Sequence, residues 1–146
     1  MSTWSRSCVL VPIDFSDASF AALAEARQIV DEPSHLHVLH VLVSLHPADP
    51  AAWGSIGQDQ RMENVQTALT KKLVDRGLAE AQVHVRMGDP GTRIAEVARS
   101  IDSDLIVISS HGRTGLGRLL LGSVAERTTR LASCPVLIIR PPDPSS

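Results

Sequence analysis

The chain has 146 residues, of which 43% are apolar and 21% are charged, and its formal net charge is −2. This composition is typical of one domain that is long enough to bury a substantial core. A balanced charge, two tryptophans, two phenylalanines and no tyrosine argue against a nucleic-acid partner. No apolar run approaches the roughly 20 residues that span a bilayer, and the N-terminal apolar stretch is too short for a signal peptide, so we expect no membrane association.

The N-terminal part of the chain predicts a strand, a helix and a second strand. Cys8–Ile13 is short, apolar and rich in β-branched residues, as is typical of a strand buried on both faces. Ser16 is the expected N-cap of a helix that continues to about Asp31. The second predicted strand is Leu36–Val43, and Asp14 follows the first strand directly.

The two cysteines, Cys8 and Cys134, each precede an apolar strand. We expect both to be buried, reduced thiols in a cytoplasmic protein. A structural disulfide or a redox pair is the alternative.

The middle of the chain begins with Ser44–Gln58, which contains two prolines and two glycines and has no clear period. Such a segment is either a lid over a binding site or a variable surface loop. A helix is predicted over Asp59–Arg76, and a third strand, nearer an edge of the sheet, over Gln82–Met87. Asp89 then starts a helix that continues to about Ile101.

The segment from Asp104 to Ser123 contains the strongest functional signal. A buried strand, Leu105–Ile108, is followed by a polar turn and a glycine-containing loop, and Ser123 then opens a helix that ends near Ser133. Glycines between a strand and a helix allow backbone amides to approach a phosphate chain, and a helix N-terminus adds unpaired N–H groups. Ser123 and Glu126 match the capping box. We therefore expect a nucleotide phosphate site here.

The last predicted strand is Pro135–Ile139, and residues 141–146 are expected to be a disordered tail after one domain over residues 1–140. Five strands that alternate with four helices predict an α/β fold, with an open parallel sheet and helices on both faces. Ligands of such sheets bind outside the carboxyl ends of the strands, where the strand order reverses. If the first and fourth strands are neighbours, Asp14 and the turn from Ser109 to Gly112 face one crevice.

From Cys8 to Arg140 the sequence resembles the universal stress protein family. The segments that carry the resemblance are VPIDFSDAS, the GDP at Gly88–Pro90, DLIVISSHGRTGL, LLLGSVAE and CPVLIIR. The resemblance implies a Rossmann-like fold of the adenine nucleotide alpha hydrolase-like type, with strand order 3-2-1-4-5. It also implies an ATP-binding stress-response and signalling module that takes ATP, alone or with Mg²⁺.

The resemblance also implies a set of binding residues. Asp14 and the backbone of Val41 would contact adenine, Pro12 and Ser109 would lie near the ribose, and Ile13 would belong to the same binding set. The phosphates would be held by Gly112, Arg113, Gly122, Ser123 and Val124, and His111 would touch the ligand from the loop.

Ser109 occupies the position where the nucleotide-binding pattern of the family has its first glycine. If that position requires a left-handed backbone, a serine there costs about 1–2 kcal/mol, which is roughly a 5- to 30-fold loss of affinity. We expect ATP binding to survive this loss. The alternative is a nucleotide-free interaction protein of the same fold.

A third possibility is a slow ATPase, although no nucleophile–base pair is recognisable, so we expect no efficient enzyme. His35 and His37 would point the same way along their strand and could hold a metal, but no further ligand completes a set, so we expect no metal site.

Val136–Ile139 is apolar on both faces. At a sheet edge it would invite a second copy, and the family resemblance likewise implies a homodimer through this strand.

Overall fold

The computed structural model describes residues 6–43, 57–111 and 121–140. The predicted tail, most of the possible lid, and Gly112 and Arg113 lie outside these residues. Among those described, five strands form one parallel sheet with the order β3-β2-β1-β4-β5, which confirms the expected fold and topology. The strands are β1 (Val9–Pro12), β2 (Leu36–Leu42), β3 (Gln82–Met87), β4 (Leu105–Ser109) and β5 (Val136–Ile139).

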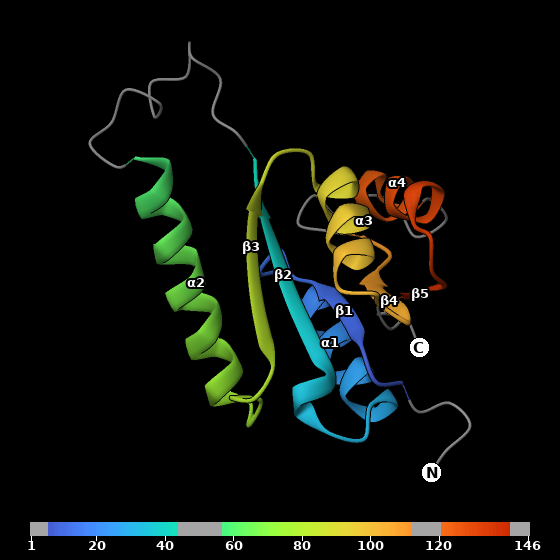
Figure 1. Cartoon of the computed structure of the whole chain (residues 1–146), viewed down its shortest axis with the longest axis horizontal. Coiled ribbons are helices and arrows are strands. Elements are labelled where there is room, and N and C mark those ends of the chain that lie inside the picture. The colour runs from blue at the N-terminus through green and yellow to red at the C-terminus, as the bar shows by residue number, and fades with distance from the viewer. Residues whose placement is uncertain (1–5, 44–56, 112–120, 141–146) are drawn as a thin grey trace, which may run out of the picture.

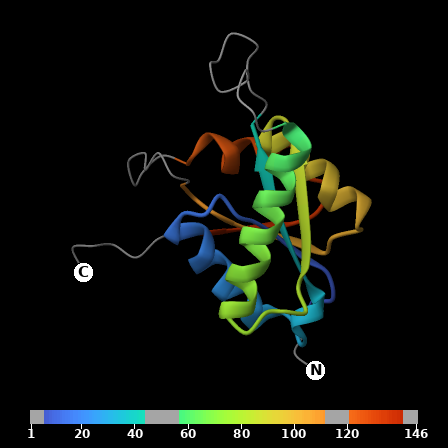
Figure 2. The ribbon, with the colours of Figure 1, turned by 90° about the vertical axis from the view of Figure 1, so that its left-hand side faces the viewer.

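The helices lie on both faces of this sheet (Figure 1). Residues of α1 (Asp17–Ile29) and α2 (Gln58–Asp75) pack against one face, and Figure 2 shows α2 lying along β3. Residues of α3 (Pro90–Ser100) and α4 (Ser123–Leu131) pack against the other. Each face therefore has its own apolar cluster, and β1 contributes to both because Val9 and Val11 face one cluster and Leu10 faces the other.

Local signals in the sequence explain most of the helix boundaries. The Ser16 hydroxyl accepts a hydrogen bond of 3.1 Å from the Ser19 amide, which confirms Ser16 as the N-cap of α1. Asp89 caps α3 in the same way through the Thr92 amide. A short 3-10 helix, η1 (Pro33–His35), precedes β2 and was not predicted.

The predicted capping box at α4 is wrong. Gly122, and not Ser123, is the N-cap, because the Gly122 carbonyl already accepts the hydrogen bond of the Glu126 amide at 2.9 Å. Ser123 is therefore the first residue of the helix, and no side chain caps it. The Glu126 carboxylate instead pairs with Arg130 one turn later, at 2.9 Å.

Leu73 and Val74 are adjacent in α2 and test the packing of this helix on the sheet. Leu73 is 1% exposed within the cluster beneath α1 and α2, whereas Val74 is 53% exposed. We expect Leu73→Ala to lower the free energy of unfolding by about 2–5 kcal/mol, because it leaves a cavity in a packed layer. Val74→Ala should change it by less than about 0.5 kcal/mol. Urea denaturation of both variants checks this, and equal losses would contradict the packing.

Candidate functional site

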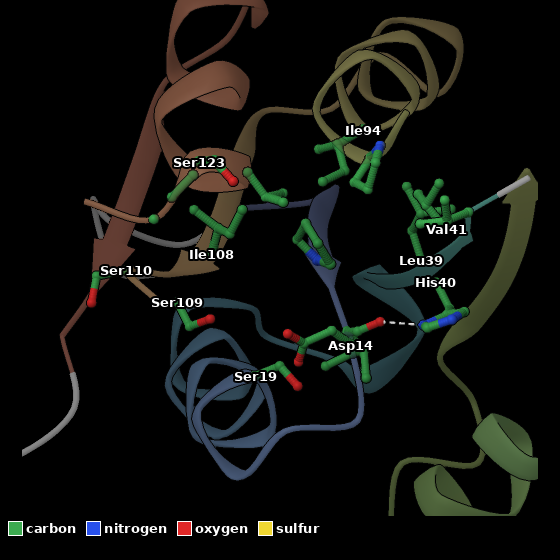
Figure 3. A pocket seen from close by; sticks show the side chains of 17 residues that line it. Asp14, Ser19, Leu39, His40, Val41, Ile94, Ile108, Ser109, Ser110 and Ser123 are labelled. Carbon is green, nitrogen blue, oxygen red and sulfur yellow. Dashed lines mark hydrogen bonds between the residues drawn. The ribbon is translucent and has the colours of Figure 1, made fainter. Parts of the chain in front are cut away.

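A cavity of about 370 Å³ opens at the carboxyl ends of β1, β2 and β4 and the N-termini of α3 and α4. This is the place where the strand order reverses, since β1 is paired with β2 on one side and with β4 on the other. Figure 3 shows the side chains around it. The residues that line it are Pro12, Ile13, Asp14, Ser19, Leu39, His40, Val41, Val43, Pro90, Ile94, Ile108, Ser109, Ser110, Gly122, Ser123, Val124 and Ala125.

Asp14 lines this cavity directly after β1, and hydrogen bonds hold its carboxylate in one orientation. Oδ1 accepts hydrogen bonds from the Ser16 amide at 2.9 Å and from the Ser16 hydroxyl. The turn between them is tight, because Phe15 has a φ of 66°. Burial alone would raise the pKa of Asp14, but the Ser16 hydrogen bonds outweigh it and lower the pKa below the ordinary value. Asp14 is therefore an anion at neutral pH.

His40 fixes the backbone that precedes Asp14. The Ile13 amide donates to the Leu39 carbonyl at 2.8 Å, and His40 Nδ1 lies 2.7 Å from the Ile13 carbonyl oxygen (dashed line in Figure 3). A carbonyl can only accept, so Nδ1 carries the proton. The His40 ring also packs edge-on against Phe15, with 5.1 Å between the ring centroids. The end of β1 is thus attached to β2 through both backbone and side chain.

The end of β4 is a buried polar turn formed by Ser109, Ser110 and His111. The Ser109 hydroxyl donates to the His111 carbonyl at 3.0 Å, and Ser110 Oγ is hydrogen-bonded to His111 Nδ1 at 3.0 Å. The Ser110 amide donates to Ile139 in β5, and its carbonyl accepts from the Gly122 amide at 2.7 Å. This turn therefore connects β4 to both β5 and the start of α4.

Ser109 does not have the left-handed backbone that would penalise a serine. Among the described residues, the non-glycine residues with a positive φ are Phe15 and Asp102. Ser109 is the last residue of β4, where it pairs with Ile139. The strain that the sequence suggested for this position is therefore absent from this chain's own structure.

The N-terminus of α4 forms the wall of the cavity near Ser110, with Gly122, Ser123 and Val124 in its lining. The first amides of a helix lack partners within the helix and carry a partial positive charge, so they attract anions. A Cβ atom on Gly122 would lie 2.9 Å from the Ser110 carbonyl oxygen. The close approach of α4 to the end of β4 therefore requires a glycine here.

The structure brings most of the predicted binding residues to this cavity. Those in its lining are Pro12, Ile13, Asp14, Val41, Ser109, Gly122, Ser123 and Val124. His111 is not in the lining, because its ring and carbonyl are engaged within the β4 turn, and Gly112 and Arg113 lie outside the described residues.

Sequence reasoning missed His40 and several apolar wall residues, among them Leu39, Ile94 and Ile108. The alternation of side chains along the strands could have pointed to Leu39 and Ile108, since both are near strand ends and face the same side as Val41.

The remaining sequence candidates are separate from this cavity. His37 contacts His84 on β3 rather than His35, and among the described residues no three metal-ligating side chains form a cluster. Cys8 and Cys134 are both free, and burial is the main factor that raises the pKa of each thiol. Within the described part of the chain, no helix is both long and apolar enough to cross a bilayer.

Comparison with known proteins identifies the family. The sequence model of the universal stress protein family matches residues 7–140, which is nearly the whole chain. The chain belongs to the universal stress protein family. Universal stress protein MJ0531 of Methanocaldococcus jannaschii is 36% identical over 140 residues, which cover 92% of this chain and 82% of that protein.

Solved structures of universal stress proteins share the fold. UspA from Lactobacillus plantarum superimposes with a TM-score of 0.74 at 24% identity, over 93% of this chain and 99% of that one. A universal stress protein in complex with cAMP gives 0.65 at 22% identity, over 92% and 97% of the two chains. A family member from Arabidopsis thaliana with AMP bound gives 0.60 at 20% identity, over 96% and 99%. At these identities the likeness establishes the fold of this universal stress protein.

Gly122→Ala tests the contact between α4 and the β4 turn, with Gly57→Ala as its control. Both glycines are helix N-caps with an extended backbone, but a Cβ at Gly57 has no neighbour within 4 Å. We expect Gly57→Ala to lower the free energy of unfolding by about 0.5 kcal/mol, the ordinary price of losing a glycine cap. Gly122→Ala should lower it by about 1–3 kcal/mol more, because the Ser110 backbone must move. Thermal denaturation measures both, and equal losses would show that α4 adjusts freely.

Proposed function

We propose that this universal stress protein binds ATP in the cavity at the carboxyl ends of β1, β2 and β4, and acts as a nucleotide-dependent stress-response module. The observation that carries the proposal is that one cavity contains two different binding groups: the fixed carboxylate of Asp14 and the N-terminus of α4 at Ser123. A carboxylate suits the donor groups of a base or a sugar, and a helix N-terminus suits phosphate. A nucleotide has both the donor groups and the phosphate.

The size and walls of the cavity support the same ligand class. A volume of about 370 Å³ falls in the range of small-molecule sites. Leu39, Val41 and Ile94 supply apolar surface for a flat base near the carboxylate. Related universal stress proteins have been solved with cAMP and with AMP, and both ligands are adenine nucleotides.

In this proposal, each part of the cavity binds one part of the nucleotide. Asp14 and the Val41 backbone contact adenine, and Pro12, Ile13 and Ser109 lie near the ribose. Gly122, Ser123 and Val124 hold the phosphates, together with Gly112 and Arg113 from the adjoining segment. His111 contributes through the β4 turn, which its ring and carbonyl hold by hydrogen bonds to Ser110 and Ser109.

Mg²⁺ would enter with the phosphates. Asp14 is the one carboxylate among the described residues that line the cavity, and Ser16 already engages its Oδ1. Phosphate oxygens and water are the ligands that Mg²⁺ prefers in such sites.

The two free thiols support a reducing compartment, so we place the protein in the cytoplasm.

The decisive experiment is a calorimetric titration with ATP and MgCl₂ up to millimolar concentration. We expect saturable binding of one nucleotide per chain. Ser123→Asp should weaken it at least about tenfold, because like charges a few ångströms apart repel strongly near a protein surface. Gln58→Asp is the control, since Gln58 is also the first residue of a helix and lies outside the cavity lining. An acidic residue stabilises either helix start, so both variants should fold.

Absence of saturable binding in the titration, together with no nucleotide released from freshly denatured protein, would overturn the proposal and favour the nucleotide-free alternative. Equal effects of Ser123→Asp and Gln58→Asp would show that the nucleotide binds elsewhere. Phosphate release on adding ATP would favour slow hydrolysis over simple binding.

We also propose a homodimer through β5, the strand at one edge of the sheet. Leu137 is 39% exposed on this strand and Leu131 is 41% exposed at the end of α4, so apolar side chains stand beside an open strand edge. Ile138 packs against the cluster beneath α3 and α4, so a charge there would also disturb the core. Leu137 is therefore the better position for a test.

Leu137→Lys should shift the protein from dimer to monomer in light scattering, because a charge would be buried at the interface. Val74→Lys is the control, since Val74 is an exposed apolar residue of α2. A dimer that persists in Leu137→Lys, or a monomer in the unmodified protein, would contradict this interface.

A further inference from the structure

A pair of histidines lies on the sheet away from the cavity, on β2 and β3, which form one end of the sheet (Figure 1). His37 is on the same face of β2 as Leu39, which belongs to the cluster beneath α3 and α4. On β3 the residues that face this side are all polar, and each is partly or fully exposed: Gln82, His84 and Arg86. The two histidines are therefore within reach of solvent.

The register of the two strands brings the histidines together. His37 is paired with Gln82, so His84 is its diagonal neighbour, two residues along β3. His37 Nδ1 lies 2.9 Å from His84 Nε2. The ring planes are 18° apart, with 5.2 Å between the centroids. Two imidazole nitrogens from separate strands thus face each other on a rigid scaffold.

Both rings are partly buried, which favours their neutral form. Burial lowers the pKa of His37, and burial, then His37 and Arg86, lower the pKa of His84. In a neutral pair one of the two facing nitrogens carries a proton and the other accepts it. Moving that proton to the outer nitrogen of the same ring leaves two lone pairs facing each other, with no net release of a proton.

We infer that His37 and His84 together bind one divalent ion of the late transition metals, in the class of Ni²⁺ and Cu²⁺. Imidazole nitrogen suits these ions, whereas Mg²⁺ and Ca²⁺ require oxygen ligands. The charged side chain near His84 is Arg86, which offers no oxygen ligand. To share an ion, each ring must turn its lone pair away from the facing nitrogen and toward the metal. With metal–nitrogen bonds of about 2.0–2.1 Å, nitrogens that stay 2.9 Å apart then subtend about 90° at the metal, which suits square-planar or octahedral coordination. Tetrahedral Zn²⁺ would need roughly 3.4 Å. Since no three ligating side chains cluster in the described part of the chain, water completes the coordination.

This site does not depend on the nucleotide proposal. Neither His37 nor His84 lines the cavity. His84 lies on β3, the edge strand, whereas the cavity opens at the ends of β1, β2 and β4. Metal binding can therefore be measured in the absence of nucleotide, and either proposal can fail while the other holds.

The test is a calorimetric titration of the untagged, EDTA-treated protein with NiCl₂ at pH 7.5. We expect one equivalent of Ni²⁺ to bind, and His37→Gln and His84→Gln each to weaken binding at least about tenfold, since each removes one of two ligands. His35→Gln is the control, because His35 lies just before β2 and contacts Glu32 at 4.0 Å rather than the pair. It should bind Ni²⁺ like the unmodified protein.

A second measurement needs no variant and so does not depend on whether the variants fold. With water in the remaining positions Ni²⁺ is octahedral and paramagnetic, so it should broaden the ring NMR signals of His37 and His84 before those of the other histidines. Earlier broadening of another histidine, no saturable binding at millimolar Ni²⁺, or binding unchanged in both glutamine variants would each overturn the inference.

Discussion

The pairing of β1 with β4 is the contact on which the rest of the structure depends. Val9 pairs with Leu105 and Leu10 with Ile106, so two segments from opposite halves of the sequence become neighbours in the centre of the sheet. The strand order reverses at this point, since β2 and β3 extend from one side of β1 and β5 extends from the far side of β4. The crossover helices then separate to opposite faces, and the cavity opens between their ends.

The two ends that meet at this reversal are made rigid in different ways. On the β1 side, His40 and Leu39 hold the backbone of Ile13, and Ser16 holds the carboxylate of Asp14. On the β4 side, Ser110 contacts both β5 and the start of α4 through its backbone. The geometry of the cavity therefore comes from hydrogen bonds within the scaffold, so a ligand would meet a site that is already formed.

Much of this arrangement could be predicted from the sequence, because it rests on periodicity. Apolar runs and helical spacing identified every strand and α-helix among the described residues, and the polar residues at the strand ends identified the edge where the cavity lies. The predicted start of α4 is one residue too late, because Ser123 and Glu126 match the capping-box pattern. In the structure the Gly122 amide donates to Ser110, and the Glu126 carboxylate pairs with Arg130 in the next turn. The local pattern reveals neither contact.

What could not be predicted depends on strand register and on side chains that meet across strands. Nothing near His37 in the sequence indicates His84, and nothing near His40 indicates the Ile13 carbonyl. The backbone of Ser109 is a similar case: a family pattern suggested strain, but its place at the end of a paired strand gives it an ordinary conformation. Such features follow from tertiary contacts, which periodicity does not encode.

The β1–β4 pairing also decides when the site can exist during the protein's synthesis. Asp14 is synthesised before its cavity partners on β4 and α4, which come from the other half of the sequence. A contact between such distant segments forms late, since the intervening chain must first be brought together. The cavity is therefore complete only once β4 and α4 have joined the sheet, so a ligand that binds there stabilises the assembled fold alone.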